Sequence, residues 1–536
     1  MRATLKKDGL VEVLNGKYLY PKDHIHDWTA PGSGAGVVLK GATGAAYLLA
    51  VATGEKQSRV SIEPVLSAIR PDSTIGVVAF VSNEKPVGVF RRRHAAQGWD
   101  EISDIEYFFK PRKGSDVSPS RVLLPISKDL ESLFFEIHSA MRDVDGLHAD
   151  EALQELCKII YTRSYEEEVA AEKGKYLLNS ERFGTTEEYA AAIRSFYKDA
   201  ADYDLRVFRL KIPQYERSRG VFNEPLRLSS PALAKIYKLI EPFDLSTSHT
   251  DIKGRAFQKV LGRAVRSGMG QYFTPNPICE LMSALVEPKV SDLIVDPFCG
   301  SGHFLTECLK RVASIEGKTT KAFHEFAFGK LHGIEKSERM VRIAMTDMRL
   351  NGDGHSNIRC TDALLEFGNY PDIAPDSFDV VITNPPFGSL LGQDALASLG
   401  EFELAKAKKN LPLEIVGLER SIQFLRPGGR LAILLPDNVF SADSARFVRG
   451  WLLDKIIPRI IISLPVETFS PFGANVKTNI LLARKLRTGE VSRQDLRICM
   501  IQASNVGYDA TGREIEGSDL PAVTETAREF LQREGW

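Results

Sequence analysis

Cysteine is scarce in this sequence, and the few cysteines are widely separated. The 536 residues include six, and no two of them form a CxxC pair or lie with histidines at metal-ligand spacing. They stand at positions 157, 279, 299, 308, 360 and 499. This pattern argues against a zinc site and a disulfide framework, and it is typical of a protein from a reducing compartment. We therefore predict no metal centre.

Long apolar runs are also missing. No window approaches the roughly 18 consecutive apolar residues that span a bilayer, and residues 1–7 lack the apolar segment of a secretory signal. The apolar share of 43% and the charged share of 26% are ordinary for a globular protein. These features predict a cytoplasmic protein without a membrane partner. The length predicts two or three domains.

A strong net charge is absent as well, since the formal value is −1. A protein that binds nucleic acid over its whole surface is strongly positive. Any nucleic-acid surface must therefore be local, or supplied largely by a partner. Three short basic groups occur at residues 91–94, 110–113 and 406–409. Such groups are more often solvated faces than binding sites.

Residues 1–125 have the pattern of a small β-rich domain. Apolar stretches predict four strands, the last two joined by a hairpin turn, at residues 36–39, 46–51, 74–81 and 86–91. The order of elements is similar to a restriction-nuclease core. However, no Asp followed by Glu-x-Lys lies on a predicted strand, and Glu55-Lys56-Gln57 has the wrong order. The sequence thus disfavours a nuclease and leaves the role of this domain open.

Residues 126–250 change to a helical period. Leu130, Leu133, Phe134, Ile137 and Met141 follow the spacing of one face of an amphipathic helix. Further helices are predicted at residues 150–163, 186–202 and 231–239. We expect a helical domain that contacts DNA or a partner protein.

Residues 251–485 alternate between strand and helix patterns. Seven strands are predicted at residues 292–295, 331–334, 357–360, 378–383, 430–434, 460–464 and 478–483. Helical stretches separate the first five, which predicts right-handed crossovers and a mostly parallel sheet. The last two are joined without a helix, so we expect an antiparallel pair. Residues 486–536 add a short strand, a turn and a terminal helix, a tail that could dock a partner.

The first strand of this region ends in a glycine-containing turn, Asp296-Pro297-Phe298-Cys299-Gly300-Ser301-Gly302. Gly300 and Gly302 let the backbone approach a ligand closely where a strand passes into a helix. The turn is not a phosphate loop, because no Gly-Lys-Ser/Thr follows, and it lacks the GxGxxG dinucleotide fingerprint.

Acidic residues follow three successive strands at the same end of the expected sheet. Asp296 suits a cationic amine, and Glu335 lies where a carboxylate can accept two ribose hydroxyls. Asp362 could bind the amino group of an adenine ring. An amine, a ribose and an adenine together describe S-adenosylmethionine. In the alternative reading, Glu335 and Asp362 only cap the segments that follow them.

The stretch Thr383-Asn384-Pro385-Pro386-Phe387-Gly388 follows the fourth strand. The two prolines end that strand and remove two backbone donors. The carboxamide oxygen of Asn384 and the carbonyl of Pro385 are then neighbouring acceptors beside the ring of Phe387, which suits the exocyclic amine of a planar base. Taken alone, such a tetrapeptide is more often a strand-ending turn. Only the cofactor motif upstream favours a site.

Three ordered motifs resemble those of N6-adenine DNA methyltransferases of the gamma group. They are Gly270-Gln271-Tyr272-Phe273-Thr274-Pro275, the turn at residues 296–302, and Asn384-Pro385-Pro386-Phe387. Over about residues 127–510 the chain is most similar to the modification subunit of type I restriction–modification systems. The stretches 156–161, 251–258 and 476–481 also indicate this likeness. His303 departs from the small residue that the family pattern predicts.

The resemblance implies an α/β fold, with a Rossmann-like, seven-stranded methyltransferase domain that uses S-adenosylmethionine. The catalytic motif would be Asn384, Pro385, Pro386 and Phe387. The residues implied to bind the cofactor are Gln271, Tyr272, Phe273, Thr274, Asp296, Phe298, Gly300, Gly302, Glu335 and Asp362. Phe469 and Phe472 are candidates for a second face that stacks on the base, and both are equally compatible with a core position.

The resemblance also implies double-stranded DNA as the substrate. Neither the loop after residue 388 nor the residues after 485 are numerous enough for a typical target-recognition domain. We therefore expect a separate specificity subunit, in an assembly of two modification subunits with one specificity subunit, to which a restriction subunit could be added.

Two other functions stay open. Protein-glutamine and RNA methyltransferases also use an Asn-Pro-Pro-aromatic tip for planar nitrogens, although the Gln-Tyr-Phe-Thr-Pro stretch and the helical domain favour DNA. A catalytically idle scaffold that holds a specificity subunit is the other alternative. A scaffold has no need of Asn384 beside two prolines, so the intact motifs argue against it.

Overall fold

The structure is a computed structural model of the whole chain. It describes residues 25–29, 35–40, 46–52, 77–82, 85–92, 99–102, 124–125, 130–173, 177–211, 221–222, 224–241, 243–245, 257, 260–261, 273–317, 320–351, 357–370, 372–406, 408–472, 475–491, 496–534 and 536. Within these residues, no helix combines the length and the apolar character needed to cross a membrane.

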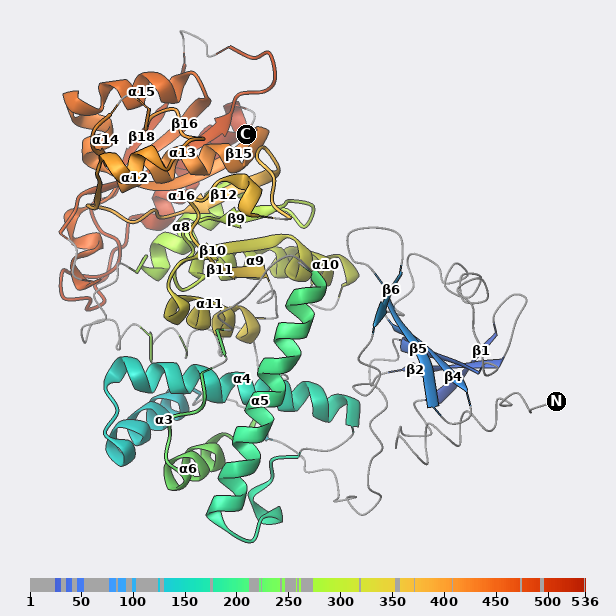
Figure 1. The fold of residues 1–536 in the computed structure, drawn as a ribbon. Coiled ribbons are helices and arrows are strands. Elements are labelled where there is room, and N and C mark those ends of the chain that lie inside the picture. Colours follow the sequence, from blue (N-terminus) through green and yellow to red (C-terminus); the bar gives the residue numbers. More distant parts are fainter. Residues whose placement is uncertain are drawn as a thin grey trace. The chain divides into compact units, whose positions relative to one another are not determined.

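The chain divides into two compact units, residues 1–123 with 165–182, and residues 124–164 with 183–536. In the first unit, neighbouring strands in chain order form one six-stranded sheet (Figure 1). These strands are β1 Ile25–Thr29, β2 Ala35–Lys40, β3 Ala46–Ala52, β4 Val77–Ser82, β5 Lys85–Arg92 and β6 Trp99–Ile102. Only β3 and β4 pair in parallel. Four strands match predicted ones, whereas Glu55–Gln57 and residues 110–113 lie outside the described residues.

The second unit begins with a group of helices. They are α3 Leu130–Asp145, α4 Ala149–Lys173, of which the residues from Tyr165 belong to the first unit, α5 Thr186–Lys211 and α6 Ser230–Ile240. The apolar face predicted for α3 is buried at Leu133, Phe134, Ile137 and Met141. Helix α6 begins after Ser229, whose side chain accepts a hydrogen bond from Ala232 N at 3.3 Å. A two-residue parallel pair, β7 Leu124–Pro125 with β8 Phe243–Asp244, flanks these helices in the chain.

The rest of the second unit contains a mixed sheet of eight strands in the order β11-β10-β9-β12-β15-β17-β16-β18 (Figure 1). The strands are β9 Ile294–Asp296, β10 Leu331–Glu335, β11 Ile358–Cys360, β12 Phe378–Thr383, β15 Leu425–Pro436, β16 Ile456–Ser463, β17 Thr478–Lys485 and β18 Cys499–Gln502. The five strands from β11 to β15 are parallel, and β17 is antiparallel to both of its neighbours.

The predicted strands and the predicted antiparallel pair are confirmed, but the predicted count of seven strands is one short. Strand β18 pairs in parallel with β16 at the edge of the sheet. The sequence predicts this short strand, but as part of a C-terminal tail at residues 486–536 and not as part of the sheet. Pairing along a sheet edge depends on a distant strand, and sequence pattern near β18 does not reveal that partner.

Helices precede, connect and follow the strands of this sheet. They are α8 Asn276–Val286, α9 His303–Glu316, α10 Lys321–Gly329, α11 Glu338–Leu350, α13 Leu413–Phe424, α14 Asp437–Ser441, α15 Arg446–Leu453 and α16 Leu520–Glu534. Helix α16 buries Leu520, Val523, Ala527 and Leu531, and Arg528 Nη2 donates to Ala284 O of α8 at 3.2 Å. One face of the terminal helix is therefore occupied within the chain.

The long connection from β12 to α13 contains three short elements, β13 Leu390–Leu391, α12 Gln393–Ala397 and β14 Leu411–Pro412. Strands β13 and β14 pair with each other. We call residues 388–412 the 388–412 loop. The basic residues Lys406, Lys408 and Lys409 are exposed on it, and Lys408 Nζ lies 3.8 Å from the centre of the Phe447 ring.

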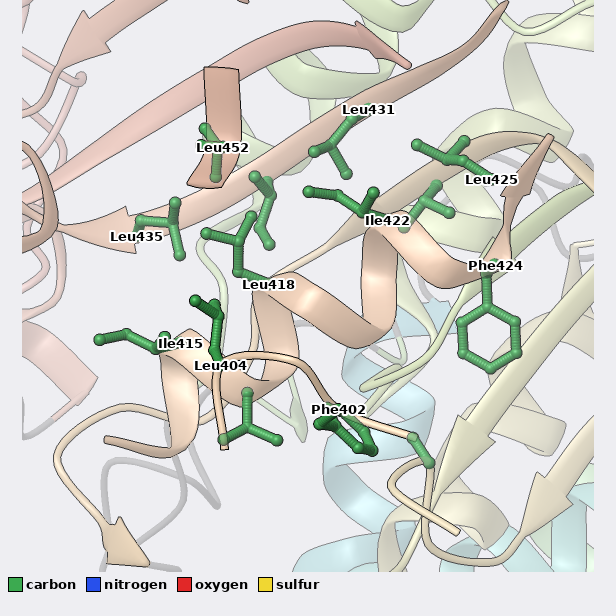
Figure 2. Packing of buried hydrophobic residues seen from close by; sticks show 14 of the residues in the cluster. Phe402, Leu404, Ile415, Leu418, Ile422, Phe424, Leu425, Leu431, Leu435 and Leu452 are labelled. Carbon is green, nitrogen blue, oxygen red and sulfur yellow. The ribbon is translucent and has the colours of Figure 1, made fainter. Parts of the chain in front are cut away.

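A hydrophobic core surrounds α13 (Figure 2). Leu418, Ile422 and Phe424 of this helix are buried with Leu431 and Leu435 of β15. Full burial of one such side chain stabilises the fold by about 1.5–3 kcal/mol. Because α13 is held this firmly, polar side chains on the same helix have well-defined positions.

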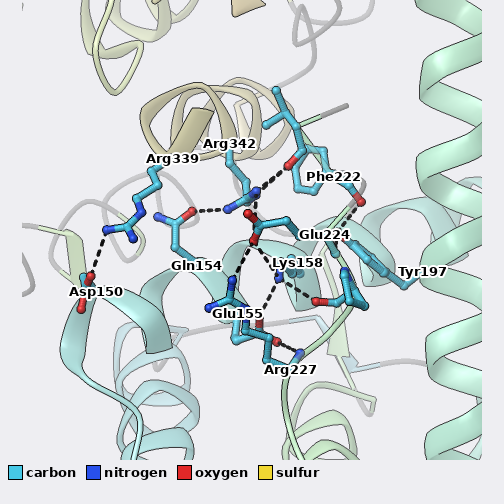
Figure 3. Close-up of polar contacts among 12 residues, drawn as sticks. Asp150, Gln154, Glu155, Lys158, Tyr197, Phe222, Glu224, Arg227, Arg339 and Arg342 are labelled. Carbon is cyan, nitrogen blue, oxygen red and sulfur yellow. Dashed lines mark hydrogen bonds and ion pairs between the residues drawn. The ribbon is translucent and has the colours of Figure 1, made fainter. Parts of the chain in front are cut away.

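A buried polar junction joins the helical segment to α11 (Figure 3). Arg342 is 2% exposed, and its Nε and Nη2 donate to Val221 O at 2.8 and 2.6 Å. Its Nη1 donates to Gln154 Oε1 of α4 at 2.6 Å. Nearby, Lys158 Nζ donates to Glu155 Oε1 at 2.7 Å. A single guanidinium thus satisfies acceptors from two separate segments.

Replacing Arg342 by Met should lower the free energy of unfolding by about 2–4 kcal/mol, because it removes charge-assisted hydrogen bonds and leaves buried acceptors unsatisfied. Urea unfolding followed by circular dichroism measures the loss. Arg339→Met is the control on the same helix. Arg339 is 65% exposed and pairs with Asp150 at 3.2 Å, so its loss should cost less than about 1 kcal/mol. Equal unfolding curves for both variants would contradict the role of the junction.

Candidate active site

Four of the predicted site residues lie at the carboxyl ends of the parallel strands. Strands β11, β10, β9 and β12 are neighbours, and their carboxyl ends lie side by side. Asp296 pairs in register with Gly333, and Glu335 pairs with Cys360. Asp296 ends β9, Glu335 ends β10, Asp362 follows β11 and Asn384 follows β12. In open α/β sheets this edge is the usual place for a ligand.

The glycine turn after β9 has the backbone conformation that its sequence suggests. Gly300 has φ 51° and Gly302 has φ 78°, values that side chains other than glycine rarely adopt. A Cβ on Gly302 would lie 3.0 Å from Ala344 Cβ of α11. Gly300 N donates to Glu335 Oε2 at 3.1 Å. The turn is thereby held close to the end of β10.

Asp296 is fully buried at the start of this turn. Its Oδ1 accepts hydrogen bonds from Thr383 Oγ1 at 2.6 Å and from Phe298 N at 3.1 Å. No donor among the described residues reaches the buried Oδ2. Burial raises the pKa of Asp296 to about 7, although the two hydrogen bonds oppose the shift. A buried carboxylate with one open oxygen suits a cationic group.

Glu335 and Asp362 bind backbone donors of the segments that follow them. Glu335 Oε1 accepts from Ser337 N at 2.7 Å, and burial raises the pKa of this carboxyl. Asp362 Oδ1 accepts from Leu364 N at 3.0 Å, and Lys336 Nζ contacts its Oδ2 at 2.9 Å. Both acids therefore do cap local segments. A carboxylate oxygen has two lone pairs, so this does not prevent either acid from binding a ligand.

Asn384 is held by a residue 110 positions earlier in the chain. Its Nδ2 donates to Thr274 Oγ1 at 3.0 Å, so the segment before α8 meets the tip of β12. The Oδ1 of Asn384 is buried, and no described residue donates to it. Buried amide oxygens are nearly always hydrogen-bonded. This oxygen is therefore a candidate acceptor for a ligand amine.

Phe387 is 8% exposed, and its ring meets the ring of Phe469 edge-to-face, with centroids 6.4 Å apart. Phe469 is 1% exposed, so it backs Phe387 from the protein side. Phe472 ends the short helix Ser470–Phe472 in the same segment. After Phe387, Gly388 has φ 79°, and its N–H donates to Glu414 Oε2 at 3.3 Å.

Helix α13 supports both motifs, which sequence reasoning did not anticipate. A Cβ on Gly417 would lie 2.8 Å from Pro385 Cβ and 3.2 Å from the ring of Phe298. Only glycine allows this helix to contact Pro385 of the Asn384 motif and Phe298 of the glycine turn together. Thr383 is a second missed residue. The signals present in the sequence were a glycine inside an apolar helix and a threonine directly before Asn384.

The remaining predicted residues have the following places. Phe273 is buried and Thr274 is half-buried directly before α8. Gln271 and Tyr272 lie outside the described residues. His303 begins α9, where burial lowers its pKa to about 3 and keeps it neutral. Within the described ranges, no group of three or more His, Cys, Asp or Glu side chains is arranged to hold a metal ion.

Comparison with known proteins agrees with this geometry. A family model described as N-6 DNA Methylase matches residues 248–536, more than half of the chain. This chain belongs to the N-6 DNA methylase family. The matched range includes the glycine turn, the acids after β10 and β11, and the Asn384 motif. It also includes β18 and α16.

Individual proteins with a similar sequence are methylase subunits of type I restriction enzymes. The type I restriction enzyme EcoEI methylase subunit of Escherichia coli is 28% identical over 47% of this chain and 50% of its own length. The EcoKI methylase subunit of E. coli K12 is 31% identical over 41% of each chain. The matches thus span about half or less of these relatives.

A solved structure shares the fold. The crystal structure of a type I restriction-modification system methyltransferase subunit from Streptococcus thermophilus has a TM-score of 0.55 and 18% identity to this chain. The similarity covers 75% of this chain and 93% of that one. At this level of identity, the likeness concerns the fold alone.

Gly417→Ala should destabilise the protein by about 1–3 kcal/mol, because the added methyl group overlaps Pro385 and Phe298 in a packed region. Thermal unfolding measures the change. Gly450→Ala is the matched control, since Gly450 also lies in a helix, α15, and a Cβ there would meet nothing within 4 Å. That control should be neutral or gain up to about 1 kcal/mol. A neutral Gly417→Ala variant would contradict the close contact.

Proposed function

We propose that this protein is the modification subunit of a type I restriction–modification system or a related defence system. In this role it transfers a methyl group from S-adenosylmethionine to the N6 atom of an adenine in double-stranded DNA. The observation that carries the proposal is the buried, open acceptor of Asn384, which lies one residue from the Thr383–Asp296 hydrogen bond. That bond joins a base receptor to a cation receptor. Membership of the N-6 DNA methylase family supports the same activity.

The residues at the sheet edge fit the proposed cofactor, which supplies an electrophilic methyl group on a positively charged sulfur. The open Oδ2 of Asp296 would accept a hydrogen bond from the amino group. Glu335 would accept the ribose hydroxyls with its remaining lone pairs, as acids in this position do in related sheets. Asp362 would hold the adenine amino group. Phe273 and Thr274, with Gln271 and Tyr272, would line the methionine end.

The proposed methyl transfer depends mainly on how the adenine N6 atom is positioned. The N6 lone pair of adenine is delocalised into the ring, so N6 is a weak nucleophile. Asn384 Oδ1 and Pro385 O would each accept one N6 hydrogen and favour a pyramidal nitrogen. The cofactor would supply the methyl group, and these two acceptors would hold N6 toward that group until N6 releases a proton to water. The residues thus act by orientation and electrostatics, with no covalent enzyme intermediate.

The target adenine must leave the duplex first, at a cost of a few kcal/mol. Stacking on Phe387 would return roughly 1–3 kcal/mol per base. Phe469 would hold Phe387 in place through their edge-to-face contact. Phe472 stays a proposed second stacking face.

We also propose a separate specificity subunit, with two copies of this chain to one of that subunit, and a restriction subunit as a further partner. The 388–412 loop is a short insertion, and residues after 485 form β18 and α16 of the same domain. Both segments belong to the second compact unit of the chain. The helical segment around α3 to α6 and the exposed side of the C-terminal segment are the proposed docking regions. Such a complex would act in the cytoplasm.

Family membership weighs against the two alternatives. A protein-glutamine or RNA methyltransferase shares the base tip, but the matched family acts on DNA by its description. An idle scaffold would have no use for the open oxygens of Asp296 and Asn384, whose burial without a partner is costly.

Asn384→Ala should abolish methylation, because it removes an acceptor for N6, and should leave cofactor binding within about threefold. Transfer of labelled methyl groups to DNA measures the first effect, and calorimetry with S-adenosylmethionine measures the second. Both assays are run on the chain alone and after addition of a candidate specificity subunit from a type I system. Unchanged transfer by the variant would refute the assignment.

Cofactor affinity should rise about tenfold per pH unit up to pH 7 and then level off, because Asp296 must lose its proton to receive the amine. The sign follows from its pKa of about 7, which is raised above the ordinary value of 3.8. The same raised pKa makes the free protein lose stability as the pH rises from 3.8 to about 7, because the unfolded chain releases the Asp296 proton at a lower pH than the folded chain. Calorimetry between pH 5.5 and 8.5 tests this. Asp296→Asn should bind weakly with little pH dependence, and an equally pH-dependent Asp296→Asn variant would contradict the role of this carboxyl.

A further inference from the structure

We infer that Arg420 is a positioning residue that couples the two halves of the proposed site. It links residues 362–370, which we call the adenosyl segment, to the 388–412 loop that follows the base motif. This inference rests on the proposed function, because it assumes that Asp362 binds the methyl donor.

Arg420 lies on α13 and is fully buried. Its Nη2 donates to Leu365 O at 2.9 Å and to Leu364 O at 3.4 Å, both in the adenosyl segment. The same segment begins at Asp362, whose Oδ1 accepts from Leu364 N at 3.0 Å. Arg420 therefore binds the backbone two and three residues beyond the proposed adenine-binding carboxylate.

Glu401 of the 388–412 loop completes the link. Its Oε2 accepts from both Nη1 and Nη2 of Arg420 at 3.3 Å. Its two oxygens also accept from Phe367 N of the adenosyl segment at 3.0 and 3.2 Å. The adenosyl segment thus touches the loop directly through Glu401 and indirectly through Arg420.

Aromatic rings fix the plane of the guanidinium. Arg420 Cζ lies 4.4 Å from the ring centre of Phe367 and 4.5 Å from that of Phe402. Phe367 belongs to the adenosyl segment and Phe402 to the 388–412 loop. A planar guanidinium between two rings has a well-defined orientation, which a lysine would not provide.

The other end of the loop is fastened to the same helix. Leu413 N donates to Ser389 O at 2.8 Å, and Gly388 N donates to Glu414 Oε2. Further along, Leu404 N donates to Glu419 Oε2 at 3.0 Å. The loop is therefore bound to α13 at Gly388, at Glu401 and at Leu404. A shift of the adenosyl segment would therefore be transmitted to the 388–412 loop through its contacts with α13.

A purely structural role explains this arrangement less well. Burying a guanidinium costs free energy that its partners only partly offset, and an apolar side chain of similar size is often as stabilising. Nothing in packing alone requires a forked donor at this position. A guanidinium, with several N–H donors in one plane, is required if it must keep the carbonyl groups of Leu364 and Leu365 and the carboxylate of Glu401 in fixed relative positions.

Arg420→Met tests the inference in the full-length chain, since Met can fill the space between the two rings. Its Kd for S-adenosylmethionine, measured by calorimetry, should rise at least tenfold. Arg484→Met is the matched control. Arg484 makes a comparable pair with Glu490 at 2.7 and 2.9 Å, and it pairs in register with Arg430 at the opposite edge of the sheet. This control should lower the thermal midpoint and leave Kd unchanged.

Hydrogen exchange tests the coupling itself. Adding S-adenosylmethionine to the unsubstituted chain should slow amide exchange in residues 362–370 and also in residues 398–406. In Glu401→Ala, which keeps Arg420, the protection should be confined to residues 362–370. This second variant also decides the matter if Arg420→Met fails to fold.

Two outcomes would overturn the inference alone. One is a folded Arg420→Met variant with the Kd of the unsubstituted chain. The other is protection limited to residues 362–370 before any substitution. If the unsubstituted chain binds no S-adenosylmethionine at all, the proposed function fails, and the inference falls with it. The result for the unsubstituted chain therefore separates the two failures.

Discussion

The hydrogen bond from Thr383 Oγ1 to Asp296 Oδ1 joins the tips of two neighbouring parallel strands, 87 residues apart in the chain. It is fully buried, so it competes with no water and sets the relative height of the two tips. Asp296 opens the glycine turn, and Thr383 directly precedes Asn384. The distance between the proposed cation-binding carboxyl group of Asp296 and the proposed base-binding side chain of Asn384 therefore depends on one short contact. The open Oδ2 is the second oxygen of the same carboxyl group, so this contact also fixes its position.

Helix α13 is the second constraint on the site. Its apolar face packs against β15, which fixes the helix (Figure 2). Its polar residues bind the loops around the site. Gly417 allows close approach to Pro385 and Phe298, and Glu414 holds Gly388. The core helix thus holds the loops around the site in place, and the proposed catalytic residues lie at a strand tip. This is the arrangement in which a site holds its geometry while its surface is free to meet a large substrate.

Much of the fold was predictable from sequence, because apolar runs of four to six residues separated by helical patterns mark buried parallel strands. The strand-end acids and the Asn384 motif could be found from their positions after such runs. The pattern predicted a short strand after residue 486 but did not reveal that this strand, β18, joins the sheet, since its partner β16 is distant in the chain. It also did not reveal Gly417, Arg420 or Glu401. Their importance arises from contacts between segments that no local spacing encodes. The buried position of Phe469 was likewise undecided, because an aromatic in a loop can face either way.

By itself, the sequence determined the family, the α/β alternation and the residue types at each strand tip, since these depend on local pattern and motif order. Only the tertiary structure decided which oxygens remain open. Asp296 accepts a hydrogen bond from the Thr383 hydroxyl with Oδ1 and has Oδ2 open, whereas Asn384 donates through Nδ2 to the Thr274 hydroxyl and has its one side-chain acceptor, Oδ1, open. That difference depends on Thr383 and Thr274, which lie beside these residues in space through strand order and loop packing. Hydrogen bonds between residues far apart in the chain depend on three-dimensional position. For this reason, the sequence predicted which residue types could bind a ligand but not which of their atoms are open to one.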